Sequence, residues 1–184
     1  MGLNLFKVDK QKIAELFSLA LFNYQRKLEM QDQSLELNLR LAQVEDAYDL
    51  AKLELESARF EPRQTPLDIP LPDFAKTWKS RIRTSEFTVI LAENAQGLMG
   101  FVALKGKIKE GFIGALYIAP LFFRQGVGRH LVLLSEEFVI LSGGNKLSLD
   151  VEMLNIGAIA FYKSLSFAPK AVKSTHLMVF IKEL

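Results

Sequence analysis

"ALYIAPLFFRQGVGRHLVLL", residues 115–134, joins an apolar run to a helix through two glycines, Gly126 and Gly128. Glycine has no Cβ and tolerates positive φ, so the pair allows a tight turn whose amide hydrogens converge. The unpaired amides and the positive dipole end of a helix N-terminus favour an anion. Arg124 and Arg129 add positive charge suited to phosphate. The segment therefore predicts a phosphate or pyrophosphate site.

Two common phosphate loops fit this segment poorly. A Walker loop ends in Gly-Lys-Ser or Gly-Lys-Thr, and this sequence has neither. A dinucleotide-binding loop needs a third glycine and an acid about 20 residues further on. Asp150 lies at a suitable distance from Gly128, but Leu131 stands where the third small residue belongs. Pro120 and five further residues also separate the loop from its strand, which argues against a dinucleotide fold.

Hydrophobic periodicity predicts the elements on both sides of the loop. Upstream we expect a helix over 9–30, a strand from Leu35, a helix over 43–60, a proline-rich loop over 61–73, a helix over 73–83 capped by Asp73, a hairpin over 87–106 and a strand over 111–120 buried on both faces. Downstream we expect a helix over 126–141, a strand over 146–154, a short helix over 155–166 and a last strand over 176–184. The strand–helix–strand unit predicts a parallel pair and the hairpin predicts antiparallel neighbours, so the fold class is α/β (α+β) with one mixed sheet.

The composition excludes several classes of protein. The chain has 184 residues, is 49% hydrophobic and 24% charged, and carries a net charge of +2, which is typical of one globular domain. It shows no run of 18 apolar residues, no targeting segment at its N-terminus and no block of basic residues, so we expect neither a membrane nor nucleic acid as partner. It has no cysteine, which excludes disulfides, thiolate metal sites and a cysteinyl acyl-enzyme and favours the cytoplasm.

A second motif follows the glycine loop. Asn155, Ala158 and Tyr162 form an Asn-x-x-Ala-x-x-x-Tyr-like segment after the next strand. Together with the order of elements, the two motifs resemble the GNAT superfamily of N-acetyltransferases over about residues 35–184. Phe123 stands at the loop's first position, where the family usually has Gln or Arg, and Ser166 replaces the glycine before Phe167.

The resemblance implies a fold and a domain division. A GNAT-like domain over 34–184 would have a mostly antiparallel sheet with one splayed parallel strand pair and helices on both faces, preceded by an amphipathic helical extension over 1–33. It also implies acetyl-CoA (coenzyme A) as cosubstrate, held in the gap between the two splayed strands. The cofactor-binding residues would be Leu116, Tyr117 and Ile118 for the pantetheine, Arg124, Gln125, Gly126, Val127, Gly128 and Arg129 for the diphosphate, and Asn155 as a cap or a pantetheine contact.

The implied reaction is direct attack of an acceptor amine on the thioester. At pH 7 a lysine-like amine of pKa about 10.4 costs about 4.6 kcal/mol to deprotonate, whereas an α-amine of pKa about 7.7 to 8 costs about 1 kcal/mol. A general base therefore matters more for the first class. Glu93 is the chosen candidate, Asp150 and Glu152 are alternatives, and water relayed to a backbone carbonyl is another. Tyr162 matches the family position whose phenol protonates the departing thiolate.

Several alternatives stay open at this stage. The protein could be a noncatalytic acyl-CoA binding or sensing module, and the N-terminal helix could make it a homodimer. The acceptor is a small-molecule or peptide amine of unspecified identity. Trp78 and Phe74 could lie over the acceptor or simply pack in the core. His130 and His176 lack the partner spacing of a metal site, so no metal is expected.

Overall fold

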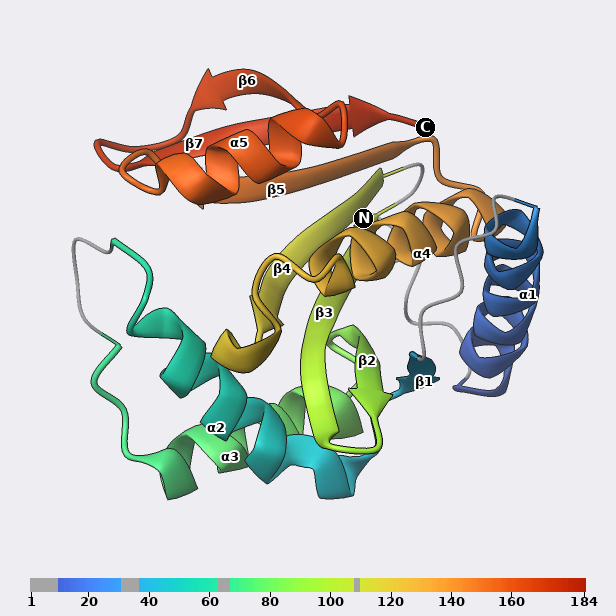
Figure 1. Cartoon of the computed structure of the whole chain (residues 1–184), viewed down its shortest axis with the longest axis horizontal. Helices are drawn as coiled ribbons and strands as arrows, with labels where there is room; N and C mark the ends of the chain where they lie inside the picture. The colour runs from blue at the N-terminus through green and yellow to red at the C-terminus, as the bar shows by residue number, and fades with distance from the viewer. Residues whose placement is uncertain (1–9, 31–36, 63–66, 108–109) are drawn as a thin grey trace.

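The computed structural model describes residues 10–30, 37–62, 67–107 and 110–184, and their arrangement is shown in Figure 1. The helices are α1 (Lys10–Glu29), α2 (Ala47–Ala58), α3 (Leu71–Arg83), α4 (Val127–Leu141) and α5 (Ile156–Ser164), with 3-10 turns η1 (Val44–Asp46) and η2 (Pro120–Phe122). The strands are β1 (Asn38–Leu41), β2 (Thr88–Asn94), β3 (Gly97–Lys107), β4 (Glu110–Ile118), β5 (Lys146–Glu152), β6 (Ala168–Val172) and β7 (Leu177–Glu183). The expected boundary at residue 33 and the expected strand start at Leu35 lie outside the described residues.

The strands form one sheet in the order β1-β2-β3-β4-β5-β7-β6. The β4–β5 pair is parallel, and the other neighbours in this order are antiparallel. Pairing of β4 with β5 covers only residues 111–113 and residues 147–149, so the two strands separate beyond Ile113. The predicted fold class, a mixed and mostly antiparallel sheet with one splayed parallel pair, is confirmed.

A β-bulge marks the point where β4 leaves β5. Ala103 pairs with Ala115 and Leu104 pairs with Ile113, which leaves Gly114 as the extra residue of β4. A Cβ on Gly114 would lie 2.4 Å from the Cε1 atom of Phe87, so a larger residue would displace that ring. The bulge thus needs glycine at this position, and it redirects the strand where the cavity described below begins.

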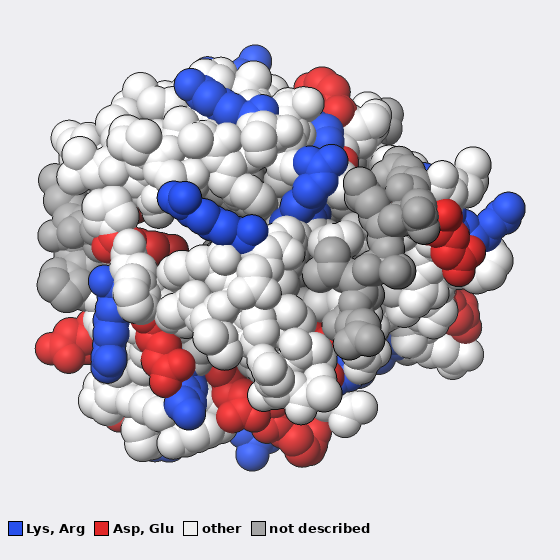
Figure 2. All heavy atoms as spheres, viewed as in Figure 1, with Lys and Arg blue, Asp and Glu red and all other residues white. Residues whose placement is uncertain are grey.

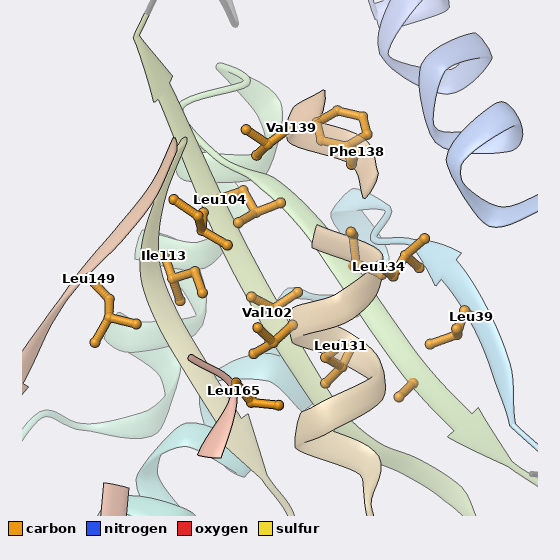
Figure 3. Packing of buried hydrophobic residues seen from close by; sticks show 14 of the residues in the cluster. Leu39, Val102, Leu104, Ile113, Leu131, Leu134, Phe138, Val139, Leu149 and Leu165 are labelled. Atoms are coloured by element: carbon orange, nitrogen blue, oxygen red, sulfur yellow. The ribbon is translucent and has the colours of Figure 1, made fainter. Parts of the chain in front are cut away.

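Each face of the sheet carries its own hydrophobic cluster. On one face, α2 and α3 pack with Trp78 fully buried against Phe101 and Tyr117. On the other face, Leu131 and Leu134 of α4 lie toward Val102 of β3, as Figure 3 shows.

Both aromatic residues considered for the acceptor side belong to the first of these clusters. Phe74 is 4% exposed and Trp78 is 0% exposed, and the indole Nε1–H of Trp78 donates a 3.0 Å hydrogen bond to Glu54. Packing therefore accounts for both.

Helix α1 adds a further layer against α4, as Figure 1 shows. One face of α1 is buried in the main core cluster through Ile13, Phe17, Ala20 and Tyr24. Tyr24 shares a 2.6 Å hydrogen bond with Nδ1 of His130 on α4. Burial raises the pKa of Tyr24 and lowers the pKa of His130, and the charge of Arg129 also lowers the pKa of His130. Both groups are therefore neutral near pH 7.

Three sequence-based expectations are corrected. Strand β4 is buried on both faces only in part: Ile113 belongs to one cluster and Tyr117 to the other, but Gly114 is exposed and Leu116 and Ile118 are only half-buried. Helix α3 begins at Leu71, so Asp73 lies in its first turn instead of capping it. Strand β6 was not predicted, because all its residues are exposed and Pro169 interrupts the pattern; proline is tolerated there since β6 is an edge strand.

One charged cluster attaches the edge strand β1 to the sheet. The guanidinium of Arg40 donates two 2.8 Å hydrogen bonds to Asp46 and bonds of 2.9 and 2.7 Å to Glu93 of β2. Hydrogen bonds from Arg40 lower the pKa of Asp46. The cluster therefore holds β1, the η1 turn and β2 together.

We predict that Arg40→Ala destabilises the protein by about 1–3 kcal/mol at pH 7, since it leaves two carboxylates without their donor. The folded pKa of Asp46 lies below its unfolded value of about 3.9, so its stabilisation is complete above that pH and is lost as pH falls. Urea unfolding at a series of pH values measures this. The difference in unfolding free energy between wild type and Arg40→Ala should become smaller in acid. The control Arg83→Ala, at an exposed position, should stay near wild type at every pH. A difference that is independent of pH would contradict the assignment.

Candidate active site

A cavity of about 690 Å³ opens where β4 and β5 separate. Its walls come from the end of α2, the second half of β4, the loop through η2 into α4, and α5. Figure 2 shows the molecule hollowed between the part with α5 and β5–β7 and the part with α2 and α3, with acidic and basic side chains at the borders. The volume is that of a small-molecule or cofactor site.

Most of the residues predicted for cofactor binding lie on this cavity. The predicted residues that line it are Leu116, Ile118, Arg124, Gly126, Val127, Gly128, Arg129, Asn155 and Tyr162. Tyr117 points its ring to the opposite face, where it packs 5.8 Å from Phe101. Gln125 does not line the cavity, and its side-chain amide donates a 2.8 Å hydrogen bond to the carbonyl of Leu121.

The edge of β4 borders the cavity directly. Its ladder with β5 ends at Ile113 and Leu149, and beyond that point the backbone groups on this side of β4 face the gap. Leu116 and Ile118 supply the adjoining side chains. Backbone donors and acceptors at such an edge are available to an extended ligand that pairs as a strand would.

The glycine loop places the N-terminus of α4 at the cavity. Gly126 is the N-cap with φ +86°, and its carbonyl accepts the first helical hydrogen bond from the amide of His130 at 3.1 Å. The amides of Val127, Gly128 and Arg129 come before that bond and have no acceptor within the helix. Together with the helix dipole they form an anion-binding arrangement.

Gly128 allows close packing around this helix end. A Cβ there would lie 3.3 Å from the Cζ atom of Phe161 on α5 and 3.6 Å from a side-chain carbon of Ile118 on β4. A larger side chain would enter the space between α4, α5 and the cavity.

The loop before Gly126 carries a charge and an aromatic ring. Arg124 has φ +60°, so its backbone is in the left-handed region, and its side chain lines the cavity. Phe123 packs edge-to-face on Phe60 from the end of α2, with ring centroids 5.8 Å apart. The position that is usually polar in this loop therefore contacts another aromatic residue.

Tyr162 presents a buried phenol at the same cavity. It is 8% exposed, lines the cavity, and packs edge-on to Phe161 and Phe167 with centroids 5.1 and 5.7 Å away. Burial raises its pKa, and the negative charge of Glu61 raises it further. The phenol therefore stays protonated near pH 7. Asn155 caps α5, since its Oδ1 accepts a 2.9 Å hydrogen bond from the amide of Ala158.

The carboxylates chosen from sequence as bases do not line the cavity. Glu93 is bonded to Arg40, and Asp150 is bonded to Lys173. Glu152 is half-buried on β5 and also lies outside the cavity wall. Among the described residues, Glu61 is the carboxylate that lines the cavity. Sequence reasoning missed it because it follows α2 in a proline-rich loop without periodicity.

Within residues 10–30, 37–62, 67–107 and 110–184, no group of three or more His, Asp or Glu side chains is placed to hold a metal ion. No helix in that part of the chain is both long and apolar enough to cross a bilayer.

Comparison with known proteins gives a family and several similar folds. A sequence model of the acetyltransferase (GNAT) family matches residues 45–167, which is more than half of the chain. No curated protein sequence matches the chain.

Solved structures with the same fold include the following three acetyltransferases. An acetyltransferase from Thermus thermophilus has a TM-score of 0.69 and 20% identity over 82% of this chain and 98% of its own. The PaiA N-acetyltransferase of Thermoplasma acidophilum, in complex with coenzyme A, gives 0.65 and 18% over 82% and 100%. The ribosomal-protein-S18-alanine N-acetyltransferase of Escherichia coli gives 0.62 and 18% over 80% and 93%.

The glycine loop, the segment from Asn155 to Tyr162 and the order of the elements resemble one family, and that resemblance implied the splayed β4–β5 pair. The family match now covers the loop, that segment and the strand pair. The chain belongs to the GNAT acetyltransferase family.

Proposed function

We propose that the protein is an N-acetyltransferase, which moves an acetyl group from acetyl-CoA to a primary amine by direct attack in a ternary complex. One observation carries the proposal: a single cavity combines the free edge of β4, the N-terminal amides of α4 with two arginines, and the buried phenol of Tyr162. A noncatalytic acyl-CoA binding module would need the first two features but not the phenol.

The residues around the cavity fit coenzyme A. The amides of residues 127–129 with Arg124 and Arg129 suit a diphosphate, and the β4 edge at Leu116 and Ile118 suits the amide-containing pantetheine arm. The similar PaiA enzyme was solved with coenzyme A, which supports this reading.

Bound acetyl-CoA would supply a thioester whose carbonyl carbon takes the acceptor nitrogen while the C–S bond breaks and CoA leaves as a thiolate. Tyr162 would donate its phenolic proton to that sulfur, because burial keeps the phenol protonated. The proton released by the nitrogen leaves through water and restores the phenol. Glu93 lies outside the cavity wall. Transfer of the acceptor's proton through water to a backbone carbonyl is therefore a simpler route than transfer to Glu93.

We propose in addition that residues 1–33 are an extension to the acetyltransferase unit over 34–184 and that they mediate a homodimer. The family match begins at residue 45, and α1 leaves Leu19 and Phe22 about half exposed on its outer side.

The first prediction concerns coenzyme A binding. CoA and acetyl-CoA, but not NAD(H), should raise the melting temperature. A ligand at 100 times its Kd stabilises the folded protein by about 2.7 kcal/mol, and each kcal/mol raises the melting temperature by roughly 2–4 °C. Gly128→Val should melt near the wild-type temperature without ligand and lose the shift, because its side chain enters the space beside Phe161. No shift of the wild type with millimolar CoA would refute the cosubstrate.

The second prediction concerns Tyr162. Tyr162→Phe should lower kcat at least about tenfold and leave the affinity for CoA nearly unchanged, because only the proton donor is removed. Tyr48→Phe, on the exposed side of α2, is the matched control and should behave as wild type. Stopped assays of CoA release give kcat, and thermal shift gives the affinity. Equal turnover in Tyr162→Phe would remove the acid role.

The third prediction concerns the oligomer. Light scattering of the full chain should give a dimer mass, and Leu19→Asp with Phe22→Asp should give a monomer that keeps its fold, because both side chains lie on the outer face of α1. A monomeric wild type would contradict the homodimer.

A further inference from the structure

Two exposed aromatic rings stand at the mouth of the cavity. Phe60, just beyond α2, is 66% exposed, and Phe123, in the loop before α4, is 40% exposed. Their rings meet at 90° with centroids 5.8 Å apart, and both line the cavity. Large apolar side chains that stay accessible at a concave site mark a surface that binds an apolar group.

Beside this aromatic pair lies a carboxylate. Glu61 follows Phe60 directly, and among the described residues that line the cavity it is the only acid. The cavity's basic residues, Arg124 and Arg129, come from the glycine loop and the first turn of α4. Glu61 is also near enough to the Tyr162 phenol for its charge to act on it. The cavity therefore has cations at the phosphate loop and an anion with two rings at the end of α2.

We propose that Glu61, Phe60 and Phe123 form the acceptor subsite, and that the acceptor is a primary amine with one positive charge and an apolar aromatic or alkyl substituent. The inference rests on the proposed acetyl transfer, because it assigns the acceptor for that reaction. The subsite is defined by the cavity wall and by the contact between the two rings.

The charges of the cavity select this class of amine. A carboxylate binds an ammonium group by a charge-assisted hydrogen bond, and an aromatic face attracts a nearby cation or covers an apolar group. The second and third cations of a polyamine would find no further carboxylate among the described lining residues. An acidic acceptor would be repelled by Glu61.

The same chemistry could come from a free amine or from a peptide whose N-terminal residue is apolar. Both present one ammonium group next to an apolar side chain. A binding experiment with both kinds of ligand distinguishes them.

The experiment is a titration of the full-length protein, saturated with CoA so that no transfer takes place, with 2-phenylethylamine, the tripeptide amide Phe-Gly-Gly and spermidine. Isothermal calorimetry or saturation-transfer NMR gives the affinities. We expect 2-phenylethylamine or the peptide to bind at least about tenfold more tightly than spermidine. Whichever of the two binds more tightly identifies the source.

Variants test the named residues. Glu61→Gln should weaken binding of the preferred amine at least about tenfold, and Phe60→Ala should weaken it about fivefold or more. Glu56→Gln and Tyr48→Ala, both at exposed positions of α2, are the matched controls and should leave binding unchanged. The CoA-induced rise in melting temperature should persist in all four variants, which shows that each is folded and binds the donor.

Two results would overturn the proposal: spermidine binding as tightly as both other ligands, or Glu61→Gln or Phe60→Ala binding the preferred amine as tightly as the wild type. They leave the acetyl-transfer function intact, because the CoA shift and turnover are measured separately. If CoA gave no shift, the transferase function would fail instead, and the same titration without CoA would still report on the subsite.

Discussion

The early end of the β4–β5 ladder is the constraint on which the site depends. The two parallel strands pair over only three residues each, and the bulge at Gly114 then turns β4 away from β5. Continued pairing would bring β5 against Leu116 and Ile118 and leave no cavity between the strands. The backbone groups that the split leaves without a strand partner take their hydrogen bonds from water or from a ligand, since main-chain donors and acceptors are rarely left unpaired. A ligand with amide groups along an extended arm would supply such partners.

The split persists because each strand is held from its other side. Strand β4 pairs along its length with β3, and β5 pairs with β7 over residues 146–152. Helix α4 crosses between the two halves: Leu131 and Phe138 belong to the main core cluster, and Glu136 accepts a 2.7 Å hydrogen bond from Lys182 of β7. Because α4 crosses in this way, its N-terminus lies at the cavity, where the amides of residues 127–129 follow the glycine loop.

Local patterns in the sequence predicted the parts of this arrangement that are local. Gly126 and Gly128 predicted the turn into α4, and Asn155 predicted the start of α5, because caps and turns depend on a few adjacent residues. The bulge at Gly114 depends on Phe87 in another strand, and β6 exists because β7 offers it an edge. The position of Glu61 on the cavity likewise follows from the packing of α2 on the sheet. None of these three has a signal within its own segment, because each depends on residues that are distant in the sequence.

The charges of the cavity also act on the Tyr162 phenol. The pKa of the Tyr162 phenol is raised mainly by burial and in addition by the negative charge of Glu61, so without an acceptor the phenol holds its proton tightly. For the acid role proposed above, a strongly held proton keeps the phenol protonated but makes its transfer to sulfur harder. An ammonium group bound at Glu61 would offset that negative charge and move the phenol's pKa back toward its ordinary value. The effect would be confined to the bound ammonium form, because the nitrogen must lose its proton before it attacks the thioester.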